Sequence, residues 1–63
     1  MQINGHVIDA EKIDMSSFPN LSFMKKEDAL RTAAAICERE GRPVNEDMIE
    51  GYLNNLDMDM SYN

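Results

Sequence analysis

The sequence predicts an all-α fold, a helical hairpin of two amphipathic helices with a short N-terminal arm. Two observations predict it: a helix stop is followed directly by a helix start, and apolar residues recur at helical spacing on both sides. Gly41 can take the left-handed conformation that ends a helix, and Pro43 cannot continue one. Asn45 can cap the second helix, with Val44 and Ile49 placed to form a hydrophobic staple across that cap.

Residues 1–21 are predicted to form an arm and loop that pack across the helices. Asn4-Gly5 lies between two short apolar runs, which is a strong signal for a β-hairpin. The strands would be very short, so an irregular arm is an equal alternative. Asp9 to Met15 can hold a helical turn, and Phe18 and Leu21 are expected to fold back onto the helices.

The chain is predicted to be a single small domain, with the helical hairpin over residues 22–56 and a C-terminal tail over 57–63. The first helix is expected to begin between Ser22 and Lys26 and to end at Glu40. Within the range of possible starts, Ser22 is the better cap by residue type. The second helix is expected over Glu46 to Leu56.

Each predicted helix has one apolar stripe. On the first helix the stripe consists of Phe23, Ala29, Leu30, Ala33, Ala34, Ile36 and Cys37. On the second it consists of Met48, Ile49, Tyr52, Leu53, Leu56 and, if the helix extends that far, Met60. The alanines allow close approach of the bulkier second helix, in which Gly51 is unfavourable by about 1 kcal/mol relative to alanine.

The small size of the chain predicts self-association. A 63-residue chain buries only about 60% of the surface exposed on unfolding, so its own core is marginal. Cys37 is the only cysteine, so no internal disulfide can support the fold. We therefore expect a homodimer in a four-helix arrangement. Its contact surface is predicted to consist of Ile49, Tyr52, Leu53 and Leu56.

The charge of the chain predicts a basic protein partner and disfavours nucleic acid. Six basic and twelve acidic residues give a formal charge of −6, and no basic residue follows Arg42. Glu46, Asp47 and Glu50 on the second helix would be available to a basic partner. The absence of a membrane-spanning run, the lack of a signal-peptide pattern and a free thiol predict a cytoplasmic protein.

No catalytic, cofactor-binding or metal-binding residues are predicted, so the chain is not expected to be an enzyme. Cys37 lies on the apolar stripe and is interpreted as a buried small side chain, and His6 as a surface turn residue. One cysteine and one histidine do not make a zinc site. Asp57 to Asn63 has oxygen ligands at alternate positions, as in a calcium loop, but Tyr62 replaces the required glycine and the closing glutamate is missing.

The methionines leave two interpretations open. Met58 and Met60 can belong either to a small core or to an adaptable contact surface, since thioether side chains fill irregular gaps. Met48 is assigned to the core.

The stretch KKEDALRTAAAICEREGRPVNEDMIEGYL, residues 25–53, and the chain as a whole resemble the small early proteins encoded between the exonuclease and excisionase genes of lambda-like temperate bacteriophages. The resemblance covers essentially the full length but includes no diagnostic motif. It implies a non-enzymatic accessory protein of the bacterial host cytoplasm, acting early in infection on lytic or lysogenic development or on host functions.

Together these observations predict a small acidic protein-interaction module, a phage regulator that binds a host or phage protein. The alternative is a DNA-binding transcriptional regulator that uses basic residues of the first helix, namely Lys25, Lys26, Arg31 and Arg39. A third hypothesis is that the acidic face imitates DNA and occupies a nucleic-acid-binding enzyme.

Overall fold

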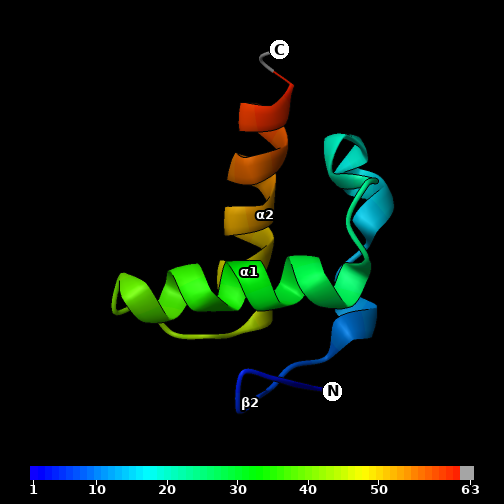
Figure 1. Cartoon of the computed structure of the whole chain (residues 1–63). Helices are drawn as coiled ribbons and strands as arrows, with labels where there is room; N and C mark the ends of the chain where they lie inside the picture. The colour runs from blue at the N-terminus through cyan, green and yellow to red at the C-terminus, as the bar shows by residue number, and fades with distance from the viewer. Residues whose placement is uncertain (62–63) are drawn as a thin grey trace.

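The computed structural model describes residues 1–61 of the 63-residue chain. Within these residues, two short strands, three 3₁₀ turns and two α-helices follow one another (Figure 1). In chain order they are β1 (Gln2–Ile3), β2 (His6–Val7), η1 (Ala10–Lys12), η2 (Met15–Ser17), η3 (Pro19–Leu21), α1 (Lys26–Arg39) and α2 (Glu46–Met60). The fold is mostly helical, as predicted, but the paired strands mean that it is not purely all-α.

The N-terminal β-hairpin forms, which decides between the two alternatives left open for the arm. Gln2 pairs with Val7 and Ile3 with His6 in antiparallel register. The turn at Asn4-Gly5 has φ angles of 52° and 86°. Asparagine and glycine tolerate this left-handed pair, whose twist matches that of the flanking strands, and this explains why so short a hairpin is specified.

Residues 9–21 wind through three short 3₁₀ turns, where the sequence predicts one helical turn and a loop. Aspartate side chains cap the first two turns. The Asp9 carboxylate accepts a hydrogen bond from the Glu11 backbone N–H at 3.2 Å, and the Asp14 carboxylate accepts one from the Ser16 N–H at 2.9 Å. These caps satisfy backbone donors locally, so the segment can direct its apolar side chains into the core.

Helix α1 begins at Lys26, at the late end of the predicted range, and ends at Arg39. Ser22 does not cap it, because the Ser22 N–H donates to the Pro19 carbonyl at 3.3 Å and closes η3 instead. The residue before the helix is Lys25, whose side chain makes no capping hydrogen bond. The competing 3₁₀ turn therefore shifts the start of the helix beyond the serine.

The link between the helices has the geometry that the sequence predicts. Gly41 has φ of 69°, in the left-handed region. Its N–H donates to the Glu38 carbonyl at 3.2 Å, and the Arg42 N–H donates to the Cys37 carbonyl at 2.8 Å. These are the two bonds of a Schellman motif, which satisfies carbonyls that would otherwise be unpaired at the helix end.

Helix α2 starts at the predicted cap and ends later than predicted. The Asn45 side chain accepts a hydrogen bond from the Met48 N–H at 2.9 Å. The helix then continues to Met60, so the residues directly after Leu56, predicted as tail, are helical. The final part of the predicted tail, residues 62–63, lies outside the described residues.

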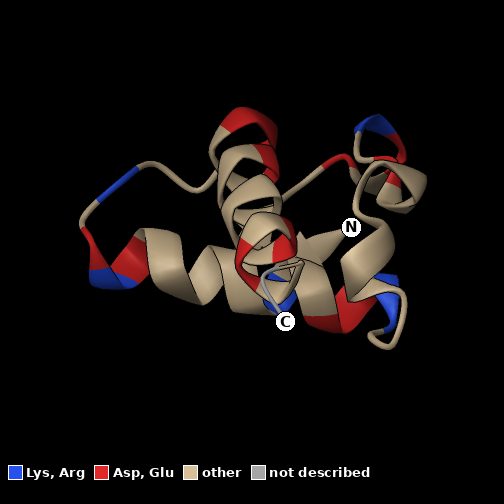
Figure 2. Ribbon diagram, turned by 90° about the horizontal axis from the view of Figure 1, so that it is seen from above, with Lys and Arg blue, Asp and Glu red and all other residues tan. Residues whose placement is uncertain are grey.

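The arm covers the two helices. In Figure 1, α2 crosses behind α1, and the segment from η1 to η3 runs beside α2 in the same direction; Figure 2 shows the same crossing from above. One core joins the three parts. The arm contributes Ile3, Ile8, Ile13, Phe18 and Leu21, α1 contributes Ala29, Leu30, Ala33, Ala34 and Cys37, and α2 contributes Ile49 and Leu53. The predicted inward packing of Phe18 and Leu21 is confirmed.

Phe23 does not pack into the core as the sequence predicts. Its side chain is 69% exposed, although the sequence places it on the stripe of the first helix. Phe23 precedes the first helical residue, Lys26, so the rotation of 100° per residue used to assign the stripe does not apply to it.

Candidate functional site

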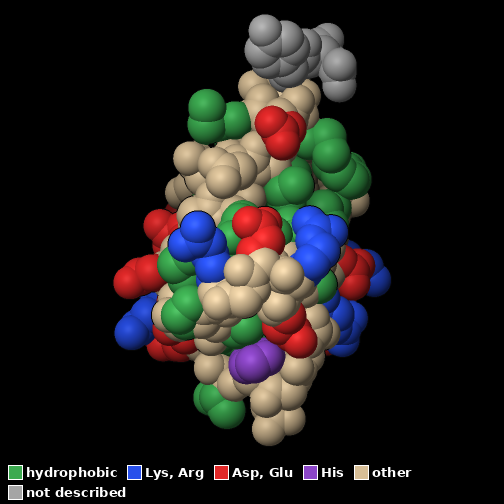
Figure 3. Space-filling model, turned by 90° about the vertical axis from the view of Figure 1, so that its left-hand side faces the viewer, with side chains coloured by type: hydrophobic (Ala, Val, Ile, Leu, Met, Phe, Trp, Pro, Cys, Tyr) green, Lys and Arg blue, Asp and Glu red, His purple; other side chains and the backbone are tan. Residues whose placement is uncertain are grey.

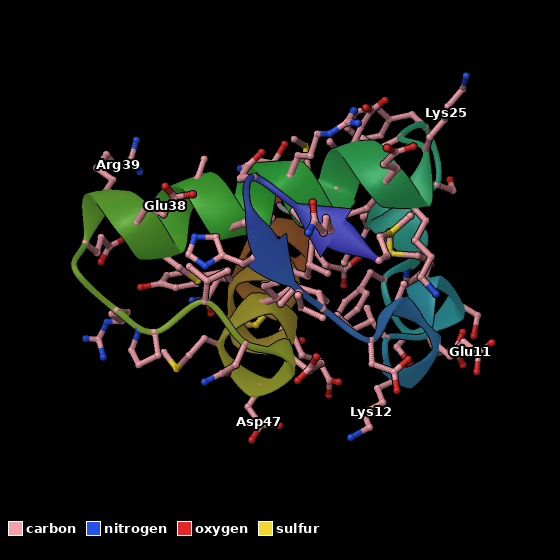
Figure 4. The ribbon with its side chains drawn as sticks, turned by 90° about the horizontal axis from the view of Figure 1, so that it is seen from below. Glu11, Lys12, Lys25, Glu38, Arg39 and Asp47 are labelled. Atoms are coloured by element: carbon pink, nitrogen blue, oxygen red, sulfur yellow. The ribbon has the colours of Figure 1, made fainter. Side chains whose placement is uncertain are left out.

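The acidic residues predicted to contact a partner lie at the start of α2, directly after the Asn45 cap. Asp47 and Glu50 are both exposed, and no salt bridge among residues 1–61 involves either of them. Figure 4 shows the labelled Asp47 side chain pointing away from the body of the protein. A carboxylate in the first turn of a helix interacts favourably with the helix dipole. These two side chains are therefore available to a cation.

Glu46, the third residue of the predicted contact surface, has a different role. One of its carboxylate oxygens, Oε2, accepts a hydrogen bond from the Asp9 backbone N–H at 2.7 Å. This bond lowers the pKa of Glu46 below its ordinary value. The side chain thus holds the arm against the start of α2, while contact of Glu46 with a partner stays a prediction.

Asp57 makes a second attachment of the same kind, which sequence reasoning missed. Its carboxylate accepts a hydrogen bond from the Asn20 backbone N–H at 2.8 Å, and its carbonyl accepts one from the Asn20 Nδ2 at 3.2 Å. Each attachment joins residues 37 positions apart in the sequence. Together they join both ends of the arm's 3₁₀ segment to α2.

The residues predicted for self-association are largely used within the chain. Ile49 and Leu53 have 0% exposure, and Tyr52 and Leu56 are partly buried against the core. The arm occupies the side of α2 that the sequence leaves for a second copy, so Ile49 and Leu53 could meet one only if the arm were displaced. These two residues are therefore not exposed for self-association.

Tyr52 lies at the edge of this buried side. Its pKa is raised because burial disfavours the phenolate and the nearby Glu40 carboxylate adds to that effect. The hydroxyl therefore stays protonated at neutral pH and is a hydrogen-bonding group rather than an anion.

The basic residues of the DNA-binding alternative do not form one patch. Arg31 contacts the Glu27 carboxylate at 2.5 Å and the Asp28 carboxylate at 3.5 Å, both on its own helix. Figure 4 shows Lys25 and Arg39 at opposite ends of α1. The charge of Arg31 is thus compensated locally, and Lys25 and Arg39 lie a helix length apart, which does not favour contact with one stretch of a phosphate backbone.

Cys37 and His6 lie where the sequence predicts, in the core and at the hairpin respectively. Cys37 is fully buried, and burial raises the pKa of its thiol. The His6 side chain is 40% exposed and its Nε2 lies 3.8 Å from a Glu38 carboxylate oxygen. On the face shown in Figure 3, the histidine lies among charged and scattered apolar side chains.

The calcium-loop interpretation does not match the backbone. Asp57 and Asp59 are helical, so their side chains point in different directions rather than toward one shared ion. Among residues 1–61, no group of three or more histidine, cysteine, aspartate or glutamate side chains is placed to hold a metal ion. Over the same residues, no helix combines the length and the apolar character needed to cross a membrane.

Comparison of the chain with known protein families, with curated proteins and with solved structures finds no match in any of the three.

Proposed function

We propose that the chain is a small acidic protein-interaction module, a phage accessory regulator that acts by binding a host or phage protein. The observation that carries the proposal is the pair of exposed carboxylates, Asp47 and Glu50, on a helix that contains no lysine or arginine. The buried side of this helix is held by the core and by the attachments at Glu46 and Asp57. The helix backbone that carries the two carboxylates is therefore held in place.

Two neighbouring negative charges on an ordered helix suit recognition of a basic surface. Because the helix backbone is already ordered, binding has to order only the side chains of Asp47 and Glu50, and complementary charges raise the association rate and exclude acidic competitors. Asp47 and Glu50 lie three positions apart, so their side chains are neighbours on the helix surface. Together they can contact a pair of lysine or arginine side chains on one partner.

Affinity capture from a bacterial lysate tests the proposal. The tagged wild-type chain is compared with Asp47→Lys/Glu50→Lys and with a matched control, Glu11→Lys/Glu38→Lys, which makes the same charge change at exposed positions on η1 and α1 (Figure 4). We expect a partner that the control retains and the α2 variant loses. Retention by both variants, or loss from both, would contradict the assignment of α2 as the contact surface.

A further inference from the structure

The exposed side of α2 forms one continuous surface, here called the outer face. It consists of Asp47, Glu50, Gly51, Asn54, Asn55 and Met58, all of which are exposed. Along its centre the spacing is i, i+4, i+7 and i+11, as for residues in a row on one side of an α-helix. The outer face lies opposite Ile49 and Leu53, which are buried in the core.

Gly51 lies in the middle of the outer face and has no structural requirement for glycine within this chain. Its backbone is helical, with no positive φ, and a Cβ added to it would meet nothing within 4 Å. Glycine at an exposed interior position of a helix lowers the stability of that helix relative to alanine. The fold therefore tolerates an unfavourable residue at an exposed position in the middle of α2.

Two shallow hollows flank this position. One is bordered by Glu40, Arg42, Met48 and Tyr52, and the other by Ser17 and Phe18. Both are also lined by Asp47, Gly51 and Asn54. The helix backbone at Gly51 thus forms a low ridge between two depressions, and another backbone can approach it more closely there than over any side chain.

The chemistry of the outer face changes along its length. Asp47 and Glu50 give its first turns two negative charges, whereas Met58, 59% exposed, gives its last turn an apolar surface. Asn54 joins the two parts, since its Nδ2 lies 3.8 Å from the Met58 sulfur. A complementary partner must present cations opposite one end and apolar side chains opposite the other.

A second copy of this chain, with twelve acidic and six basic residues, is a poor complement for a negatively charged surface. The Arg31 side chain on the exposed side of α1 already contacts Glu27 and Asp28, and Lys25 and Arg39 lie at opposite ends of the helix. Packing α2 against α2 would place like charges together. The charge of the outer face therefore favours a different protein as the occupant.

We infer that a basic amphipathic helix of a partner protein packs along the outer face of α2, with its closest approach at Gly51. The inference rests on the proposed function, that the chain acts by protein contact, and adds the form of the partner. Lysine or arginine residues of the partner helix contact Asp47 and Glu50, and its apolar residues contact Met58. Gly51 lets the two helix backbones approach between them.

The test uses two synthetic helical peptides. The probe has about 18 lysine, leucine and alanine residues, with the lysines in one row along the helix. The control peptide has glutamate in place of each lysine. Binding is measured by fluorescence anisotropy at near-physiological salt. Each variant is first checked for folding by circular dichroism and thermal unfolding. We expect the lysine peptide to bind the wild type and the glutamate peptide to bind at least about tenfold more weakly.

Variants at Gly51 separate close packing from charge. Gly51→Leu should weaken binding of the lysine peptide at least about tenfold and Gly51→Ala about threefold, because each added side chain separates the backbones. Ala35→Leu, at an exposed position on α1, is the matched control and should leave binding unchanged. If Gly51 were merely a poorly chosen helix residue, Gly51→Ala would raise the unfolding temperature without changing binding.

The outcomes distinguish this inference from the proposed function. Wild-type affinity in both Gly51 variants, or failure of the lysine peptide to bind, overturns the packed helix. The proposed function would then still depend on whether Asp47→Lys/Glu50→Lys loses its partner from the lysate. Loss of binding in the Gly51 variants, with Ala35→Leu unaffected, supports the packed helix.

Discussion

Gly41 and Gly51 are both exposed, but the backbone conformation favours glycine at position 41 and a residue with a side chain at position 51. Gly41 has φ of 69°, whereas Gly51 is helical and a Cβ there would enter open space. Gly41→Ala should therefore lower the free energy of unfolding by about 1 kcal/mol, since an L-residue is strained in the left-handed region. Gly51→Ala should raise it by about 0.5–1 kcal/mol, because alanine is the better helix former.

Urea denaturation of the two variants and the wild type measures both changes. Each variant serves as the control for the other, because the chemical change is the same and only the backbone conformation differs. A loss of stability at position 51 would mean that the helix needs glycine for a reason within the chain, and would remove the argument that an external partner uses it.

The Glu46 carboxylate makes the stability of the arm depend on pH. Its hydrogen bond from the Asp9 N–H lowers the pKa from its ordinary value of 4.5. The unfolded state therefore binds the proton more readily, so this contribution to stability is complete above the unfolded pKa and is lost as pH falls through the folded one. Asp14, whose pKa is lowered by hydrogen bonds from Ser16, acts in the same direction.

Thermal unfolding between pH 6 and pH 3 tests the role of Glu46. In Glu46→Gln, the unfolding temperature should fall less steeply below pH 4.5 than in the wild type, because the titrating group has been removed. Glu50→Gln is the matched control on the same helix, and its curve should follow the wild type. Identical acid slopes for all three proteins would show that the attachment at Asp9 contributes nothing to stability.

At the scale of elements, local signals predict the two helices and their link. The Schellman geometry at Gly41 and the cap at Asn45 depend on residues within a few positions, so the sequence alone identifies them. The 3₁₀ segment of the arm is different, because its attachments join Asp9 to Glu46 and Asn20 to Asp57 across 37 positions. Such contacts leave no periodic pattern in the sequence.

The same limit explains which parts of the candidate site were predicted. Helical rotation correctly places Asp47 and Glu50 on the exposed side of α2. It cannot show that Glu46 reaches back to the arm, because that requires knowing where the arm lies. The sequence predicts Ile49 and Leu53 as a contact surface for the same reason. When the position of the arm is unknown, nothing within the chain is seen to cover their apolar stripe.

The arm is expected to be an integral part of the fold. Ile13, between η1 and η2, is 0% exposed, so Ile13→Ala should lower the free energy of unfolding by about 3 kcal/mol. A 63-residue domain has roughly 3–9 kcal/mol in total, so this one truncation removes a large part of its stability.

Urea denaturation again provides the measurement, with Val7→Ala as the control within the same arm. Val7 is 79% exposed, and its truncation should change stability by less than about 0.5 kcal/mol. An Ile13→Ala variant as stable as Val7→Ala would mean that the helices fold without the arm, and the case for a second copy covering them would return.

At the scale of the whole molecule, the burial pattern changes the argument about oligomeric state. The sequence predicts a homodimer because two helices alone leave an apolar stripe uncovered. With Ile3, Ile8 and Ile13 packed into the core, the arm supplies a cover that does not depend on concentration. Among residues 1–61, the large apolar side chains that stay exposed are Met1, Val7, Phe23, Met58 and Met60.

We therefore expect unfolding that is independent of protein concentration. A protein stabilised by dimerisation gains stability by mass action, so its unfolding temperature rises with concentration, whereas a chain covered by its own arm shows one temperature throughout. Sedimentation velocity and thermal unfolding over a hundredfold concentration range would measure this. A rising unfolding temperature with a dimer-sized species would contradict the expectation and restore the homodimer. Met58→Asp, on the outer face, would weaken a dimer formed there while leaving the core intact.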